Sequence, residues 1–166
     1  LNTGFIDSKL VKKNLAFCYI NSERYDEALS LLDEILKQYP DDITSLNMKG
    51  YALEKTGKIK ESIAIYSLII RNNKKNLNSM NSAAYLMAKN GGDLDSALKL
   101  ANYVYLMDNK NPAYKDTLGY IYMKKGDLKK AEDLFFEAYR DIPFNKELQE
   151  HIMELKELKM KSTFKR

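Results

Sequence analysis

The chain has 166 residues, of which 45% are apolar and 30% are charged, and its formal net charge at pH 7 is +4. This is the balance of one soluble domain that is long enough to bury a sizeable core. The charge is mild and lysines are mixed with acids along the chain, so no nucleic-acid partner is expected. A single cysteine excludes an internal disulfide framework, and three prolines are too few for a turn-rich sandwich or barrel.

Residues 1–8, LNTGFIDS, are expected to form an N-terminal linker or partial cap. The stretch that follows them occurs four times along the chain. Its copies begin at residues 14, 48, 82 and 117, which places them 34, 34 and 35 residues apart. A period of this length indicates stacked helical units, because each unit needs its neighbours to bury its apolar face.

Each copy has the residue pattern of two antiparallel helices joined by a short turn. Two columns hold only small side chains, as is expected where two helices cross at close range. The columns contain Ala16, Gly50, Ala84 and Gly119, and then Ala28, Ser62, Ala97 and Ala131. The turn glycines are Gly57, Gly91 or Gly92, and Gly126. Asp93 and Asp127 can cap the helix after the turn, and Pro40 and Pro143 close the second helix of their copies.

This period and these columns resemble the tetratricopeptide repeat family, whose unit is a helix–turn–helix of about 34 residues. The resemblance covers about residues 9–145, and the last two repeats are most similar to those of bacterial members. The repeats it implies are 9–42, 43–76, 77–111 and 112–145. The implied fold is all-α, a right-handed α-solenoid of about four repeats. Residues 146–166 would add a capping helix and a basic tail, because apolar residues recur at helical spacing from Leu148 to Leu158.

The sequence carries no arrangement typical of an active site, so no enzyme activity, cofactor or metal is expected. His151 is the only histidine, and it is interpreted as a solvated or half-packed side chain on the capping helix. Cys18 shares its repeat column with apolar residues and is interpreted as a small buried residue. Zinc-ligand spacings, a Walker loop and a dinucleotide fingerprint are all absent from the sequence.

The resemblance places six positions of each first helix toward a concave groove that binds partners. The candidate partner-binding residues at these positions are Lys13, Asn14, Phe17, Asn47, Met48, Tyr51, Lys55, Asn81, Ser82, Tyr85, Lys89, Asp116, Thr117, Tyr120 and Lys124. Asparagines can donate to and accept from a peptide backbone, and aromatic rings supply contact area at low entropy cost. The lysines favour an acidic ligand or a free C-terminus. The competing interpretation is that these lysines are common family-wide and that the aromatic rings only pack along the groove wall.

The carboxylate clamp with which some members of the family grip chaperone C-termini is not reproduced. Lys13 matches one of its residues, while Phe17 and Met48 stand where its asparagines belong. Asn78 and Ser82 replace its remaining lysine and its arginine. A chaperone co-factor of that type is therefore not expected.

The sequence thus predicts a non-enzymatic scaffold that binds a partner peptide or segment in the concave groove. Two alternatives stay open: a self-associating assembly scaffold, and the recruiting domain of a larger protein. No apolar run approaches the roughly 20 residues that span a bilayer, so no transmembrane segment is expected. The compartment is left open between cytoplasmic and, if an N-terminal signal or anchor was removed, exported or periplasmic.

Overall fold

The computed structural model describes residues 8–163, and within this range the chain forms nine helices and no strand. The helices are α1 (Ser8–Asn21), α2 (Tyr25–Gln38), α3 (Ile43–Lys55), α4 (Ile59–Asn72), α5 (Leu77–Lys89), α6 (Leu94–Met107), α7 (Pro112–Lys124), α8 (Leu128–Asp141) and α9 (Lys146–Thr163). The predicted all-α fold of helix–turn–helix pairs is confirmed. The expected N-terminal linker lies, except for Ser8, outside the described residues.

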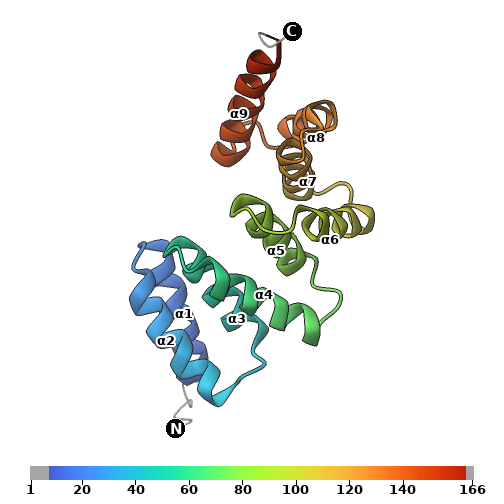
Figure 1. The fold of residues 1–166 in the computed structure, drawn as a ribbon. Helices are drawn as coiled ribbons and strands as arrows, with labels where there is room; N and C mark the ends of the chain where they lie inside the picture. The colour runs from blue at the N-terminus through green and yellow to red at the C-terminus, as the bar shows by residue number, and fades with distance from the viewer. Residues whose placement is uncertain (1–7, 164–166) are drawn as a thin grey trace. The chain divides into compact units, whose positions relative to one another are not determined.

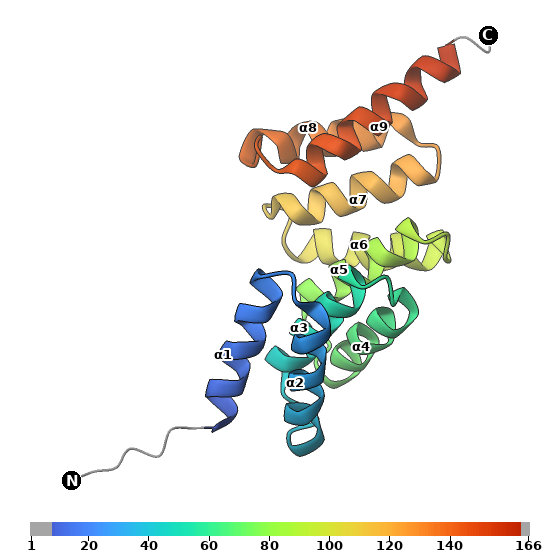
Figure 2. The ribbon, with the colours of Figure 1, turned by 90° about the vertical axis from the view of Figure 1, so that its left-hand side faces the viewer.

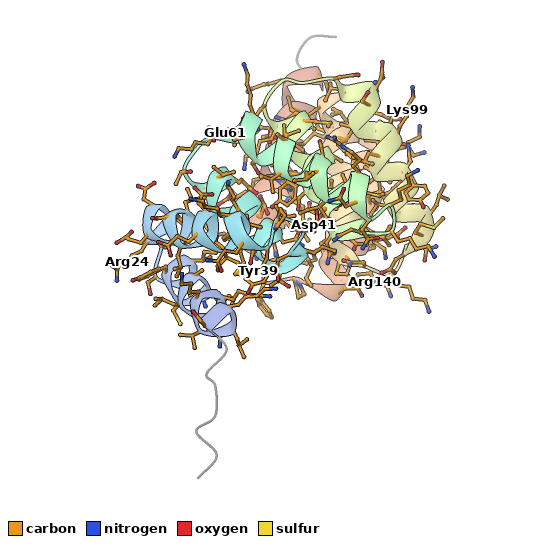
Figure 3. All side chains as sticks on the ribbon, turned by 90° about the horizontal axis from the view of Figure 1, so that it is seen from below. Arg24, Tyr39, Asp41, Glu61, Lys99 and Arg140 are labelled. Atoms are coloured by element: carbon orange, nitrogen blue, oxygen red, sulfur yellow. The ribbon has the colours of Figure 1, made fainter. Side chains whose placement is uncertain are left out.

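The described chain divides into two compact units, whose helices are labelled in Figure 1. Unit 1 is residues 8–79 and holds α1 to α4 with the first residues of α5. Unit 2 is residues 80–163 and holds the rest of α5 with α6 to α9. Charged side chains such as Arg24, Glu61 and Lys99 project outward from the helices in Figure 3, so the mixed charges of the sequence lie on the surface.

In unit 1, the helices of a pair approach closely because small residues lie where they cross. A Cβ atom on Gly50 would lie 2.9 Å from the Tyr66 ring, so a larger residue would force the ring or the helix to move. At the same crossing, the buried Ser62 hydroxyl donates to the Gly50 carbonyl oxygen over 2.7 Å. This bond satisfies a polar group whose burial would otherwise cost stability. Ala16 and Ala28 are fully buried between α1 and α2.

The turns inside the repeats contain residues in the left-handed region of backbone conformation. Gly57 and Gly126 have φ angles of +76° and +85°, which glycine adopts without a steric cost. Glu23 takes the equivalent place in the first repeat with a φ angle of +58°. For a residue with a side chain, this conformation costs about 1–2 kcal/mol. Asp93 and Asp127 cap α6 and α8 by accepting backbone N–H groups of the first turn, as the sequence predicted.

In unit 2, α9 completes the core. The ring of Phe135 in α8 packs over Gly119 in α7, where a Cβ atom would lie 2.8 Å from it. Leu148 and Leu155 of α9 are buried in the same core, and α9 contacts both α7 and α8 (Figure 2). Burying a leucine side chain contributes about 1.5–3 kcal/mol, so these two residues anchor α9 to the unit.

Candidate functional site

Four of the predicted groove residues surround one open hollow in unit 1. Its volume is about 520 Å³, and we call it the unit 1 hollow. Its lining residues are Phe17, Ile20, Asn21, Glu23, Tyr25, Asn47, Met48 and Tyr51. Phe17 and Tyr51 face the solvent, with 56% and 41% of their surface exposed. Aromatic side chains that are this exposed can supply apolar contact area to a partner.

Asn47 is partly used by the protein itself. Its Nδ2 atom donates to the Ile43 carbonyl oxygen over 3.0 Å, and its Oδ1 atom accepts from the buried Ser79 hydroxyl over 2.9 Å. A side-chain amide has two N–H donors and an oxygen with two lone pairs. Asn47 can therefore still donate once and accept once toward the hollow.

Lys13 is held by Asp42 at the N-terminus of α3. Its Nζ atom lies 3.1 Å from Asp42 Oδ1, and Lys9 Nζ lies 2.6 Å from Oδ2. Although burial alone would raise the pKa of Asp42, hydrogen bonds from the two lysines and the Ser45 amide hold this pKa well below its usual range. Lys13 therefore helps to fix the start of α3, while Asn14 is exposed on α1.

In unit 2, the corresponding aromatic residues are covered by α9. The ring centres of Tyr85 and Tyr120 lie 5.1 Å apart, and the His151 ring lies 4.5 Å from Tyr120. His151 is 6% exposed, and its Nδ1 atom lies 2.8 Å from Asp116 Oδ1. Burial raises the pKa of Asp116 and outweighs the opposing effect of the bond with His151. Asp116, Thr117 and Tyr120 are all buried, so α9 occupies the face that they would offer to a partner.

Two glutamates of α9 bind the polar atoms of this face. The Tyr85 hydroxyl donates to Glu147 Oε1 over 2.6 Å, and Lys89 Nζ lies 4.0 Å from the same oxygen. Burial, together with Glu147, raises the pKa of Tyr85 far above its usual range, so the hydroxyl keeps its proton for this bond. Lys124 Nζ donates to Glu154 Oε1 over 2.6 Å. The polar side chains predicted to bind a partner are here satisfied by the chain itself.

The remaining predicted residues lie in the middle of α5 and at the end of α3. Asn81 and Ser82 are half-buried on α5, and the Asn81 Oδ1 atom has no hydrogen-bond donor among the described residues. Lys55 is exposed at the end of α3, with its Nζ atom 5.1 Å from the centre of the Tyr51 ring. Within unit 1, neither the Lys55 ammonium group nor the Tyr51 hydroxyl has a hydrogen-bond or ion-pair partner.

Two residues lie in environments that the sequence did not predict. His151, expected to be solvated or half-packed, is buried because Asp116 and the aromatic rings of unit 2 surround it. Cys18, expected to be buried, is exposed. Its column partner Ala52 is buried within the helix stack, whereas no described helix precedes α1 to cover Cys18.

Sequence reasoning also missed the polar residues of α9 that cover unit 2. The signal that could have found them is the repeat period, because α9 begins 34 residues after the start of α7, at Lys146 and Pro112. Glu147, His151 and Glu154 then fall on the groove positions of a further first helix. The acids and the histidine of α9 thus complement the tyrosines and lysines that precede them.

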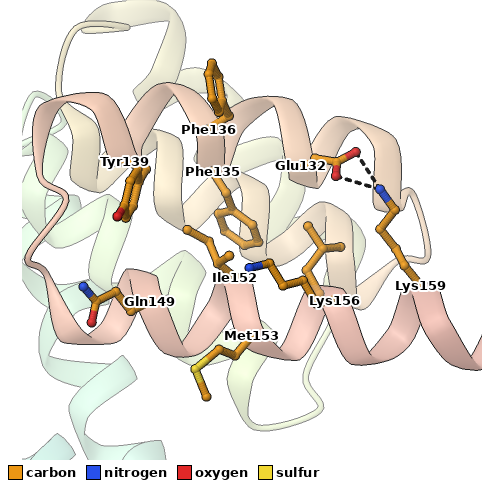
Figure 4. A pocket seen from close by; sticks show the side chains of 10 residues that line it. Glu132, Phe135, Phe136, Tyr139, Gln149, Ile152, Met153, Lys156 and Lys159 are labelled. Atoms are coloured by element: carbon orange, nitrogen blue, oxygen red, sulfur yellow. Dashed lines mark hydrogen bonds and ion pairs between the residues drawn. The ribbon is translucent and has the colours of Figure 1, made fainter.

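A second hollow, of about 570 Å³, lies between α8 and α9 (Figure 4). Phe135 and Ile152 lie between the two helices, and Tyr139 stands at one end. At the other end, Lys159 Nζ lies 2.7 Å from both carboxylate oxygens of Glu132. None of the residues predicted to bind a partner lines this hollow.

Residues 8–163 contain no group of three or more His, Cys, Asp or Glu side chains that could hold a metal ion. No helix within the same range has the length and apolar character needed to cross a membrane.

Two family models match the chain, and both carry the description tetratricopeptide repeat. One matches residues 7–50, and the other matches residues 43–76 and 114–140. The chain is 24% identical over 123 residues to a TPR repeat-containing protein of Pseudomonas aeruginosa and 32% identical over 132 residues to one of Methanocaldococcus jannaschii. These alignments cover 74% and 78% of the chain, which spans only 21% and 23% of the length of the two relatives.

Solved structures have the same fold. A tetratricopeptide repeat protein from Parabacteroides merdae superposes with a TM-score of 0.77 at 14% identity, covering 92% of this chain and 59% of that chain. YrrB, a TPR protein with an unusual peptide-binding site, superposes with a TM-score of 0.69 at 20% identity, covering 86% of this chain and 73% of that chain. At such identities the likeness shows the fold alone, and that fold is the predicted helical-repeat solenoid.

Proposed function

The chain belongs to the tetratricopeptide repeat family, whose folds are scaffolds for protein–protein interaction and are generally not enzymes, and we propose that it holds a segment of a partner protein in the unit 1 hollow. The observation that carries this proposal is the exposure of Phe17 and Tyr51, at 56% and 41%, around a space of about 520 Å³. The corresponding face of unit 2 is occupied by α9, so the partner is assigned to unit 1.

The lining of the hollow supplies both affinity and orientation. Covering the exposed rings removes apolar surface from water, which stabilises a complex by about 25 cal/mol per Å². Met48 adds a flexible apolar wall that can adapt to different side chains. The free donor and acceptor of Asn47 can bind a peptide backbone, which fixes the position of a segment along the hollow.

The proposal is tested by capturing proteins from an extract of the source organism with the chain and with a Phe17→Ala, Tyr51→Ala variant. Both side chains are exposed, so the variant is expected to stay folded, which circular dichroism checks. Tyr103→Ala, Leu106→Ala is the matched control, because these two residues are 42% and 75% exposed in unit 2.

The expected result is a protein that the wild type and the control retain and the hollow variant loses. Equal capture by all three chains would contradict the proposal, because the partner would then bind elsewhere.

The second hollow supports a second candidate function, self-association through α8 and α9. Phe136 and Met153 line it and are 66% and 61% exposed, so a second copy that covered them would bury apolar surface. Light scattering should then show a mass that rises with concentration, and Phe136→Ala, Met153→Ala should abolish the rise. A mass that stays at that of the monomer would exclude this candidate.

A further inference from the structure

A tyrosine and a lysine four residues apart recur in three of the first helices of the repeats. These tyrosine–lysine pairs are Tyr51 and Lys55 in α3, Tyr85 and Lys89 in α5, and Tyr120 and Lys124 in α7. In each pair the lysine Nζ atom lies over the ring, at 5.1, 5.0 and 4.9 Å from its centre. Residues four apart lie on one face of a helix, so each pair presents a hydroxyl and an ammonium group on the same side.

In unit 2, at least one member of each tyrosine–lysine pair contacts a glutamate of α9. Tyr85 donates to Glu147 Oε1 over 2.6 Å, and Lys89 Nζ lies 4.0 Å from that oxygen. Lys124 donates to Glu154 Oε1 over 2.6 Å. Although partial burial opposes the change, the bond with Glu154 helps to raise the pKa of Lys124. Both members of the Tyr85 and Lys89 pair thus lie against one carboxylate, whereas in the Tyr120 and Lys124 pair the lysine alone binds one.

The third pair, Tyr51 and Lys55, has the same geometry but no carboxylate partner within unit 1. Tyr51 lines the unit 1 hollow and is 41% exposed, whereas Tyr120 is 5% exposed beneath α9. Glu23 is the acidic residue in the lining, and it forms no ion pair with Lys55. Tyr51 therefore faces the open hollow, and Lys55 lies beside its ring.

The other end of the hollow has different chemistry. Where unit 2 carries Tyr85 and Lys89, the equivalent positions of α1 carry Phe17 and Asn21. These two residues lack the hydroxyl and the positive charge, and Phe17 offers an exposed apolar ring instead. The hollow therefore has an apolar end on α1 and a carboxylate-binding end on α3.

We infer that the partner segment places a glutamate side chain against Tyr51 and Lys55 and an apolar side chain against Phe17. The carboxylate would accept hydrogen bonds from the Tyr51 hydroxyl and the Lys55 ammonium group; in unit 2 a tyrosine hydroxyl donates to Glu147 and a lysine donates to Glu154. This inference rests on the proposed function and narrows its partner to a segment in which an acidic side chain stands close to an apolar one. The two ends of the hollow then set the direction in which the segment lies.

The test uses the full chain and a synthetic peptide copied from residues 146–159 of α9, acetylated and amidated at its ends. This sequence already presents glutamates to tyrosine–lysine pairs. In the probe, Glu147→Leu supplies an apolar side chain, Glu150→Gln and Glu157→Gln remove two other acids, and Glu154 stays as the only acid. NMR titration of the ¹⁵N-labelled chain gives both the affinity and the residues that the peptide touches.

The expected result is that peak shifts concentrate on α1 and α3. A charge-assisted hydrogen bond is lost when the probe carries Glu154→Gln, so its affinity should fall about tenfold or more. Lys55→Met in the chain should lower the affinity for the probe by a similar factor. It should also remove the difference in affinity between the two peptides. Lys60→Met, an exposed lysine on α4, is the matched control and should change nothing.

Several outcomes would overturn the inference: no binding of the probe, equal binding of the Glu154→Gln probe, or shifts confined to α7 and α9. A Glu154→Gln probe with a free C-terminus separates the two sources of a carboxylate. If the free C-terminus restores binding that depends on Lys55, the site reads chain ends and the side-chain inference falls.

Failure of this inference can be told apart from failure of the proposed function. Suppose that capture of the partner requires Phe17 and Tyr51, but that the Lys55→Met variant captures it with the same affinity as the wild type. The hollow would then remain the binding site, and only the acidic contact would be overturned. Capture that does not depend on Phe17 or Tyr51 would overturn both.

Discussion

The two units carry the same kinds of residue at the same repeat positions, yet those residues are open in unit 1 and covered in unit 2. In unit 1, Phe17 and Tyr51 face the solvent around the hollow. In unit 2, their counterparts contact Glu147 and His151 of α9. The groove positions differ little between the units, so the adjoining helix decides which face stays available. A groove residue is therefore a binding residue only where the chain does not supply its own ligand.

Mutations at matched positions should therefore have different effects in the two units. Side chains that touch α9 help to hold unit 2 together, so replacing them should lower its stability. Phe17 and Tyr51 of the unit 1 hollow are exposed, so replacing them should affect binding while leaving stability nearly unchanged. The predictions that follow compare matched positions in the two units.

The largest effect is expected from releasing α9. Leu148→Ala and Leu155→Ala each remove a buried side chain from the core of unit 2, and each should lower the free energy of unfolding by about 2–5 kcal/mol. Urea denaturation measures this loss. Met153→Ala with Met160→Ala is the control on the same helix, because these residues are 61% and 56% exposed. If the leucine variants were as stable as this control, α9 would not belong to the core.

A smaller difference in stability is expected between mutations at one repeat position in the two units. Tyr120 is 5% exposed and Tyr51 is 41% exposed. Tyr120→Ala should cost about 3–5 kcal/mol, as truncation of a buried aromatic does. Tyr51→Ala should cost less than about 1 kcal/mol, in line with exposed positions. Equal costs in urea denaturation would show that Tyr51 supports the fold and would remove the contrast between the units.

The sequence predicted the elements that depend on local sterics. Gly50 and Gly119 lie where helices cross, and Gly57 and Gly126 take the left-handed turns, because no larger residue fits those places without strain. Small residues and glycines that recur at the repeat period are therefore enough to predict the fold.

The contacts by which α9 covers the groove residues of unit 2 were harder to predict from the sequence. The period of 34 residues continues into α9, but Met153 and Lys156 stand where earlier first helices carry a small residue and a large apolar one, so the packing columns of the repeat are not kept in this helix. The burial of His151 depends on side chains of other helices, and such contacts leave no periodic signal in the sequence.

The units should also differ in the pH dependence of two carboxyl groups. Burial raises the pKa of Asp116, so its contribution to the stability of unit 2 is present at low pH and is lost as the pH rises through the raised value. For Asp42, burial is outweighed by hydrogen bonds that lower the pKa. Its contribution to unit 1 is present above the ordinary carboxyl value of about 3.9 and is lost as the pH falls toward the lowered one.

Hydrogen exchange resolved by residue, and corrected for intrinsic rates, measures these contributions separately. In amides of unit 2, wild type should be protected from exchange more strongly than Asp116→Asn, and this advantage should be larger at low pH. In amides of unit 1, wild type should be protected more strongly than Asp42→Asn, and this advantage should be larger at neutral pH. Differences with the same sign in both units would contradict the two assignments.

The smallest effects concern the charges of the tyrosine–lysine pairs. Lys124 and Glu154 are 31% and 40% exposed, and such an ion pair contributes less than about 1 kcal/mol to stability. Glu154→Gln should therefore lower the stability of unit 2 slightly, and 1 M salt should reduce the difference because salt weakens solvent-exposed ion pairs. Lys55→Met should leave the stability of unit 1 unchanged, because Lys55 has no ion pair there. If Lys55→Met destabilised its unit more than Glu154→Gln does, the Tyr51 and Lys55 pair would be a structural element, and the open carboxylate-binding end of the hollow would have no basis.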